Sequence, residues 1–223
     1  MHTRIGNVIL VGTSHISQDS VQEVRQVVAT YQPHGIAVEL DPVRLQSLFS
    51  KQRSRFTLRF GIGVGIFMFI ASLIQQGLGK YVKLQPGSDM KEGVLQAKQY
   101  NIPLFCVDQH IYITMKKLNK VLTFRFFLRL LKDAFTKKNG MAIRINLKKV
   151  PTQRVIEQAM HVMQQQYPQL YDILVEQRNK VMVKHIQHIM QKQTQDFVLV
   201  VIIGAAHLKG MKALLEQPIH SSV

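Results

Sequence analysis

The fold is decided by Val8-Ile-Leu-Val-Gly-Thr-Ser-His15, a stretch near the start of the chain, and by its counterpart Val200-Val-Ile-Ile-Gly-Ala-Ala-His207 near the end. Each stretch consists of four apolar residues, a glycine, two small residues and a histidine. A short apolar run rich in β-branched residues predicts a buried strand of a parallel sheet, and the glycine after it allows a sharp turn. We expect the two Gly-x-x-His motifs to converge on one cleft at the carboxyl edge of the sheet, where open α/β sheets bind ligands.

Apolar strand-like runs alternate with amphipathic stretches along the rest of the chain. Strands are predicted over 8–11, 35–40, 102–107 and 197–203, and helices over 17–31, 90–100, 124–138, 151–166, 170–193 and 208–216. This alternation is typical of an α/β fold. Because no linker or low-complexity tract divides the chain, we expect a single domain over residues 1–223.

The composition indicates which class of protein and which cellular compartment to expect. The chain has 223 residues, 46% of them hydrophobic, which is enough for one sizeable core. Its formal net charge of +16 favours contact with polyanions or anionic membrane surfaces. The single cysteine, Cys106, excludes an intramolecular disulfide, and the polar N-terminus lacks the apolar region of a secretory signal. We therefore expect a cytoplasmic protein, with a peripheral position at the inner face of the membrane as an alternative.

Two segments of the sequence favour contact with a membrane. Residues 60–74 are almost free of polar side chains, and Gly61 and Gly65 have the spacing that lets helices pack closely. Because a spanning helix needs about 20 apolar residues, the helix expected over 60–78 is buried, interfacial, part of a homodimer interface, or a true span. Residues 124–138 form a basic amphipathic helix, which either covers the core or docks on an anionic membrane surface.

The polar residues at the predicted strand ends are the candidates for chemistry. Glu39 and Asp41 follow one apolar run, and Asp108 follows another. The chain has no phosphate-binding Gly-Lys-Ser loop, no Gly-x-Ser-x-Gly nucleophile elbow and no His-Glu-x-x-His zinc helix. The sequence therefore argues against the enzyme classes that these motifs define, and it points to carboxylates and histidines at the sheet edge.

With these motifs in order, the chain resembles the TraB family, which includes the pheromone-shutdown proteins and is distantly related to the Tiki proteases. The resemblance covers nearly the whole chain. It rests on the Gly12 to His15 motif with Ser17; Val38-Glu39-Leu40-Asp41 with Arg44; Pro86-Gly87-Ser88-Asp89-Met90; Val107-Asp108 with Thr114; Arg178-Asn179 with Met182; and Gly204 to His207 with Gly210.

The resemblance implies an α/β fold with a mixed central sheet flanked by helices, built from two related halves as in TraB, Tiki and EreA/ChaN-like proteins. It also implies a metal-dependent site, since the Tiki relatives are regarded as metalloproteases. The implied metal ligands are His15, His207 and Glu39, and such imidazole and carboxylate groups suit Zn, Mn or Co.

The resemblance also implies roles for the remaining residues of the cleft. Glu39 or Asp108 would manage the proton, and Arg44 and Arg178 would orient the substrate or stabilise an oxyanion. The other expected binding residues are Gly12, Thr13, Ser14, Gly204 and Gln177.

Two departures from the family's pattern leave two functions open. The family has Asp-Arg where this chain has Asp108-Gln109, and Glu-Arg-Asn or Glu-Arg-Asp where it has Gln177-Arg178-Asn179. A neutral amide cannot act as a general base or give a carboxylate to a metal. We expect either a metal-dependent hydrolase of peptide substrates, in which Glu39 carries the chemistry, or a catalytically impaired module that binds a peptide or partner. Nucleic-acid binding is the weakest hypothesis, because only the net charge supports it.

Overall fold

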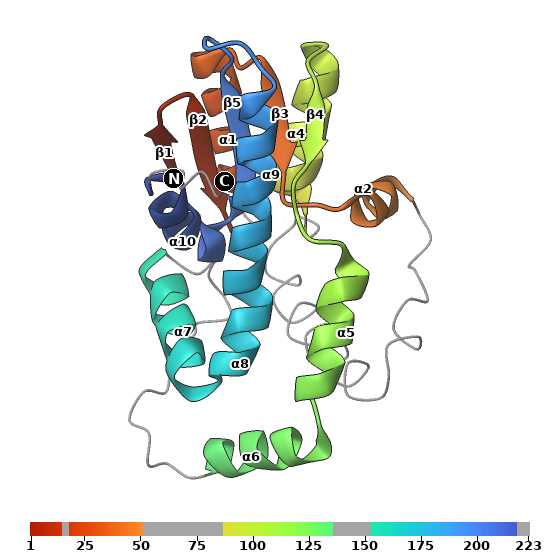
Figure 1. The fold of residues 1–223 in the computed structure, drawn as a ribbon, viewed down its shortest axis with the longest axis vertical. Coiled ribbons are helices and arrows are strands. Elements are labelled where there is room, and N and C mark those ends of the chain that lie inside the picture. The colour runs from red at the N-terminus through yellow and green to blue at the C-terminus, as the bar shows by residue number, and fades with distance from the viewer. Residues whose placement is uncertain (15–17, 51–86, 136–152, 218–223) are drawn as a thin grey trace, which may run out of the picture.

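A mixed five-stranded sheet forms the centre of the protein (Figure 1). The computed structural model describes residues 1–14, 18–50, 87–135 and 153–217. In spatial order, the strands are β1 (His2–Ile5), β2 (Val8–Thr13), β5 (Leu199–Gly204), β3 (Gly35–Val38) and β4 (Leu104–Cys106). Only the pairing of β1 with β2 is antiparallel within this sheet, and the other pairs are parallel. The predicted α/β class with a mixed sheet is confirmed, whereas β1 was not predicted.

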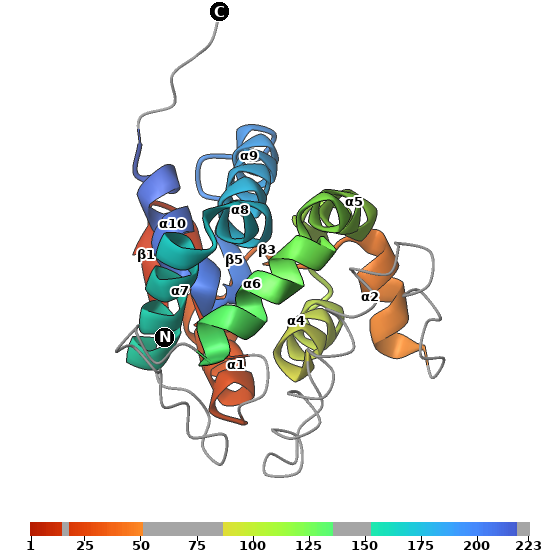
Figure 2. The ribbon, with the colours of Figure 1, turned by 90° about the horizontal axis from the view of Figure 1, so that it is seen from below.

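Helices cover both faces of the sheet, as Figure 2 shows from below. On one face, α1 (Gln18–Tyr31) and α4 (Ser88–Gln99) pack on the side chains of Ile9, Val11, Val200 and Ile202. On the other face, α9 (Gln177–Gln191) and α10 (Ala205–Leu215) pack on Leu10, Val201 and Ile203. Successive residues of a strand point to opposite faces, so residues 8–11 of β2 and 199–203 of β5, which are covered on both faces, are all apolar. Both strands are fully buried, as their unbroken apolar runs predicted.

A group of helices lies beyond the edge of the sheet at which β3 leads into α2 (Pro42–Phe49) (Figure 1). This group consists of α5 (Ile111–Val121), α6 (Phe124–Phe135), α7 (Gln153–Gln166) and α8 (Pro168–Tyr171). Met115, Leu118, Leu122, Leu170 and Ile173 form a separate apolar cluster there. This group therefore lies at the carboxyl ends of the parallel strands and not at their amino ends.

The helix predicted over 170–193 is divided by a π-helical segment. Residues Asp172–Glu176 form this segment between α8 and α9, and the N–H of Gln177 bonds to the carbonyl of Asp172, five residues back. Such segments are often found at functional sites. The extra residue in this turn changes the direction of the side chains that follow, which include Gln177 and Arg178.

The apolar residues of α6 are divided between core and solvent. Phe126 and Phe127 pack against the cluster around Leu118, whereas Phe124 is 77% exposed and Leu128 is 49% exposed. Helical spacing places Phe124, Phe127 and Leu128 on one side of α6. The cluster covers only Phe127 of these three and leaves Phe124 and Leu128 exposed.

No helix among the described residues is both long enough and apolar enough to cross a membrane. The apolar segment 60–78 lies outside the described residues.

Gly93 allows a test of how closely α4 approaches the sheet. A Cβ at this position would lie 2.3 Å from Cδ1 of Ile202 and 3.3 Å from Cγ1 of Val38. An alanine at an open helix position stabilises by about 0.5–1 kcal/mol relative to glycine, but overpacking a core costs about 1–3 kcal/mol. Because Ile202 is fully buried, we expect Gly93→Ala to lower the free energy of unfolding by about 1–2 kcal/mol, measured by urea denaturation.

The matched control is Leu95→Ala, at an exposed position of the same helix. This substitution should change the free energy of unfolding by about 0.5 kcal/mol or less. A Gly93→Ala protein more stable than the parent would contradict the close approach.

Candidate functional site

The two Gly-x-x-His turns begin side by side. Strands β2 and β5 are parallel neighbours, with Gly12 opposite Ile203 and Thr13 opposite Gly204. The predicted adjacency of the two strand ends is therefore confirmed. His15 lies outside the described residues, so the approach of the two imidazoles stays a prediction.

The first turn uses its small residues to hold the backbone. A Cβ on Gly12 would lie 2.9 Å from Cδ2 of Leu208 in α10, so the glycine allows the helix to approach the strand. The Thr13 hydroxyl has two acceptors within hydrogen-bonding distance, the buried carboxylate of Asp89 and, at 3.0 Å, the carbonyl of Ile203. The N–H of Ser14 donates to Oγ of Ser20 at 3.2 Å. In this structure, Thr13 and Ser14 make contacts that join β2 to β5, α4 and α1.

Glu39 joins the second turn to the rest of the site. It follows β3 directly, is 6% exposed, and accepts the backbone N–H of Gly204 on Oε2 at 2.6 Å. Its Oε1 accepts Nη2 of Arg178 and lies 3.3 Å from Nε2 of His207. One carboxylate at the end of β3 therefore contacts the end of β5 and the helices α9 and α10.

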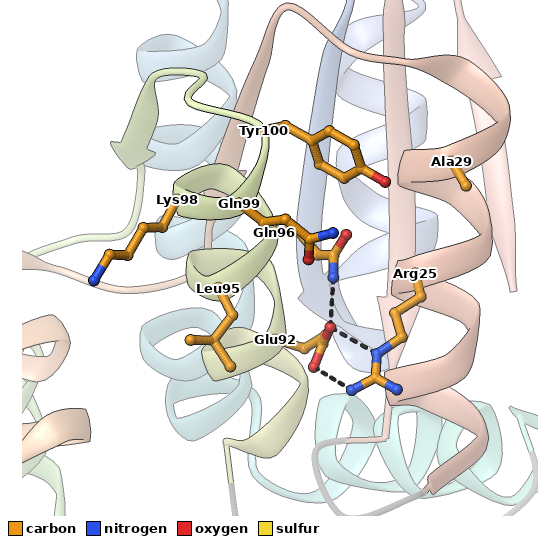
Figure 3. Close-up of a pocket in the computed structure, with 8 residues that line it drawn as sticks. All are labelled: Arg25, Ala29, Glu92, Leu95, Gln96, Lys98, Gln99 and Tyr100. Carbon is orange, nitrogen blue, oxygen red and sulfur yellow. Dashed lines mark hydrogen bonds and ion pairs between the residues drawn. The ribbon is translucent and has the colours of Figure 1, made fainter.

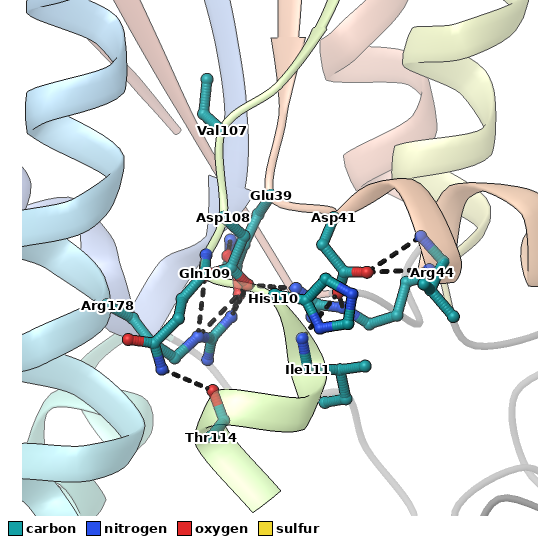
Figure 4. Close-up of polar contacts among 12 residues, drawn as sticks. Glu39, Asp41, Arg44, Val107, Asp108, Gln109, His110, Ile111, Thr114 and Arg178 are labelled. Atoms are coloured by element: carbon teal, nitrogen blue, oxygen red, sulfur yellow. Dashed lines mark hydrogen bonds and ion pairs between the residues drawn. The ribbon is translucent and has the colours of Figure 1, made fainter.

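Asp108 is the second carboxylate of the site, and two arginines converge on it (Figure 4). Nε of Arg178 donates to Oδ1 of Asp108 at 3.1 Å, and Nη2 of Arg178 bonds to Oδ2. Nη2 of Arg44 bonds to the same Oδ2. Burial acts to lower the pKa of Arg178, but the nearby carboxylates Glu39 and Asp108 outweigh it and raise the pKa above its ordinary value. Arg178 therefore remains a cation and keeps both carboxylates compensated.

Asp41 positions Arg44. Its Oδ1 accepts the backbone N–H of Val43 at 2.9 Å and so caps α2, while its Oδ2 accepts Nε of Arg44 at 2.6 Å. Burial acts to raise the pKa of Asp41, but the hydrogen bonds and charge of Arg44 prevail and lower it. An aspartate before a proline is a common helix start, so the pair Asp41-Pro42 marks the beginning of α2, a helix that was not predicted.

His207 lies in the first turn of α10 rather than before it. The helix was predicted to begin at Leu208 but begins at Ala205, directly after Gly204. His207 is 4% exposed, and its Nδ1 lies 2.7 Å from Oδ1 of the fully buried Asn179. Asn179 belongs to the Arg178-Asn179 motif, for which the pattern predicted no role of the asparagine.

The two glutamines at the departures from the family pattern make other contacts. The amide of Gln177 bonds to Nζ of Lys117 and, at 2.6 Å, to Oδ2 of Asp172. The amide of Gln109 donates to the Thr114 hydroxyl at 2.8 Å, and its backbone N–H donates to Asp108. Gln177 is thus directed towards Lys117 of α5. Gln109, in contrast, lies beside Asp108 and contacts Thr114 (Figure 4).

A further polar cluster lies away from these residues, in a hollow of about 760 Å³ between α1 and α4 (Figure 3). Arg25 binds the buried Glu92 through both carboxylate oxygens, at 2.7 and 3.0 Å, and Gln96 donates to Glu92 at 2.8 Å. The hydrogen bond from Arg25 is the largest cause of the lowered pKa of Glu92. Since these groups bind one another, the cluster holds α1 against α4.

The donors at the strand ends can be tested against the implied metal ion. Two ligands about 2.1 Å from one tetrahedral ion lie about 3.4 Å apart, and Nε2 of His207 lies 3.3 Å from Oε1 of Glu39. This pair suits a shared ion. No group of three or more His, Cys, Asp or Glu side chains that could hold a metal exists among the described residues. A complete ligand set would need a residue such as His15, which the described ranges exclude.

The buried charges of the site predict a large effect of one substitution. Replacing Arg178 by methionine leaves Glu39 and Asp108 buried with fewer cationic partners, and breaking a buried ion pair costs about 3–5 kcal/mol. We expect Arg178→Met to lower the free energy of unfolding by about that amount in urea denaturation at pH 7. As a control, Lys212→Met removes an exposed pair with Glu216 at 3.8 Å and should change it by about 1 kcal/mol or less. Similar effects of the two substitutions would show that the buried network is not a main support of the fold.

Comparison with known proteins identifies relatives of the chain. The model of the TraB/PrgY/gumN family matches residues 2–219. The chain is also similar to Uncharacterized protein MJ1365 of Methanocaldococcus jannaschii, with 28% identity over 232 residues. That alignment covers 97% of this chain and 56% of the relative, so the chain spans about half the length of this curated protein. Because the family match extends over almost all of the sequence, the chain belongs to the TraB/PrgY/gumN family.

Proposed function

We propose that the protein is a metal-dependent hydrolase that acts on a peptide substrate at the carboxyl ends of β2, β3 and β5. The observation that carries this proposal is the pair formed by His207 and Glu39, whose Nε2 and Oε1 atoms lie 3.3 Å apart. Both side chains are buried, at 4% and 6% exposure, and Glu39 is held by the N–H of Gly204. A histidine and a carboxylate fixed at a sheet edge are a suitable basis for acid–base chemistry.

His207, Glu39 and His15 are the residues that would hold the metal ion. A bound Zn, Mn or Co ion would polarise the scissile carbonyl and lower the pKa of a bound water molecule. The proposed roles of the chain's own residues follow from their charges. The Glu39 carboxylate can accept a proton from water, and the Arg178 guanidinium, which contacts Glu39 and Asp108, is placed to stabilise negative charge on the substrate.

A second candidate function is a peptide-binding or regulatory module that uses the same residues without catalysis. The observation in its favour is the pairing of the carboxylates. Asp108 accepts from both Arg44 and Arg178, and Glu39 accepts from Arg178 and Gly204. The carboxylate oxygens that would accept a proton or bind a metal ion are therefore already engaged by donors of the chain itself. Gln109 and Gln177 supply no further carboxylate.

Metal analysis and peptide cleavage distinguish the two functions. For protein purified without chelator, we expect about one equivalent of transition metal, and less than about 0.1 equivalent for His207→Ala, since dedicated sites bind tightly. The control is His188→Ala, which changes an exposed histidine of α9 and should retain the metal. Glu39→Gln should abolish cleavage of a defined mixture of unstructured peptides, followed by mass spectrometry.

Two outcomes would contradict the hydrolase. Metal below about 0.1 equivalent in the parent protein, unchanged by His207→Ala, would remove the metal from the proposal. Peptide binding that saturates without cleavage, in metal-loaded protein, would favour the binding module. Circular dichroism of each variant shows whether a loss reflects unfolding.

A peripheral position on an anionic membrane is a further part of the proposal. The exposed Phe124 and Leu128 of α6 support it, because the exposed Arg125 lies beside them on the same helix. Apolar side chains flanked by cations are typical of helices that lie on a membrane surface. The net charge of +16 acts in the same direction.

Vesicle flotation tests the membrane proposal. We expect the protein to float with vesicles containing phosphatidylglycerol at low salt and to be released at about 1 M salt, where the Debye length is about 3 Å. The double substitution Phe124→Ser and Leu128→Ser should weaken binding at least about tenfold, because it removes two apolar anchors. The control Leu95→Ser changes an exposed leucine on α4 and should bind normally. Equal binding of both variants would assign the interaction to another surface.

A further inference from the structure

Asn179 has an unusual hydrogen-bonding position. It is fully buried on α9, and its Oδ1 lies 2.7 Å from Nδ1 of His207. Its Nδ2 has no hydrogen-bond partner within the described part of the chain. A buried donor without a partner costs about 1–3 kcal/mol. A side-chain position in which both Oδ1 and Nδ2 are hydrogen-bonded would ordinarily have the lower free energy. The observed orientation therefore needs a cause.

Gly210 provides the space that the end of the Asn179 side chain occupies. A Cβ at position 210 would lie only 2.4 Å from Nδ2 of Asn179 and 3.5 Å from its Cγ. The glycine of α10 thus faces the amide directly. The helix that carries His207 also shapes the position of the residue that contacts His207.

The orientation of the Asn179 amide determines which nitrogen of His207 carries the proton. When Oδ1 faces the ring, Nδ1 must be the donor, because an amide oxygen only accepts hydrogen bonds. Nε2 of a neutral ring then presents a lone pair towards Oε1 of Glu39, 3.3 Å away. When Nδ2 faces the ring instead, Nδ1 accepts and Nε2 carries the proton, which it can donate to Glu39.

These two states have different consequences for Glu39 and His207. In the observed state, Nε2 of a neutral ring directs a lone pair towards a carboxylate oxygen that also accepts Nη2 of Arg178. A proton or a bound cation between Nε2 and Oε1 would then join the two side chains. In the reversed state the pair is closed by its own hydrogen bond. Ligand histidines commonly donate their other ring N–H to a neighbouring acceptor, which fixes the tautomer.

We propose that Asn179 is a positioning residue that keeps the proton of His207 on Nδ1, so that Nε2 is directed towards Glu39 as an electron-pair donor. The use of that donor for metal binding rests on the proposed function, but the position of the proton does not. Asn179 acts through His207, and Gly210 keeps the space that the amide occupies.

Nitrogen-15 NMR of the histidine rings tests this assignment, because it reports directly which ring nitrogen is protonated. His185 is an internal standard, since its Nδ1 lies 2.7 Å from the carbonyl oxygen of Val107, which can only accept. In the parent protein at one fixed pH, we expect the Nδ1 resonances of both His207 and His185 in the protonated range.

Three variants then separate positioning from packing. Asn179→Leu, which has a similar volume and no acceptor, should move the His207 proton to Nε2 and leave His185 unchanged. Asn179→Asp retains an acceptor and should keep the proton on Nδ1. Gly210→Ala should displace the amide through its Cβ and give the same change as Asn179→Leu, whereas the exposed neighbour Lys209→Ala should give no change.

The proposal is overturned if His207 carries its proton on Nε2 in the parent protein, or if Asn179→Leu folds and leaves the proton on Nδ1. If Asn179→Leu does not fold, Gly210→Ala and Asn179→Asp decide the matter, since they retain a polar side chain at position 179. A shift of the proton in protein that neither binds metal nor cleaves peptides would support the role of Asn179 while the hydrolase fails.

Discussion

The structure depends on one buried ionic network, in which Arg178 holds Glu39 and Asp108 together at the carboxyl ends of β3 and β4. Charged groups are costly to bury and are retained only when they are paired and hydrogen-bonded. Here, the compensation comes from elements far apart in the sequence. Arg44 follows β3, Arg178 lies on α9, and the N–H of Gly204 ends β5. The network thus links the ends of the strands to the helices that cover them.

Much of the fold could be predicted from the sequence because the central strands are buried on both faces. Apolar runs such as 8–11 and 197–203 have no alternative to the interior, and their flanking glycines mark where each strand turns. The carboxylates Glu39 and Asp108 were found for the same reason, as polar residues directly after such runs. Strand β1 was missed because His2–Ile5 is short, and its side chains are half-buried or exposed.

The remaining features depend on contacts that a local pattern does not contain. The π-helical segment Asp172–Glu176 changes the direction of Gln177, which an ideal helical period would place on the apolar stripe. Asn179 meets a histidine 28 positions further along the chain, so no local spacing could assign its role. The repeated Gly-x-x-His pattern indicated His207, and the family resemblance supplied Arg178 as a site residue. Neither could show that the arginine contacts both carboxylates.

The position of β5 has a consequence for how the protein is made. This strand lies between β2 and β3, although its residues follow those of the other four strands of the described sheet. During synthesis, the edges of β2 and β3 that pair with β5 lack this partner until residues 199–204 have left the ribosome. Such edges favour association with other chains, and long-range strand pairing is slow. An incomplete chain that lacks this strand would also leave Glu39 without the backbone N–H of Gly204. We therefore expect the nascent protein to depend on chaperones until β5 has paired with β2 and β3.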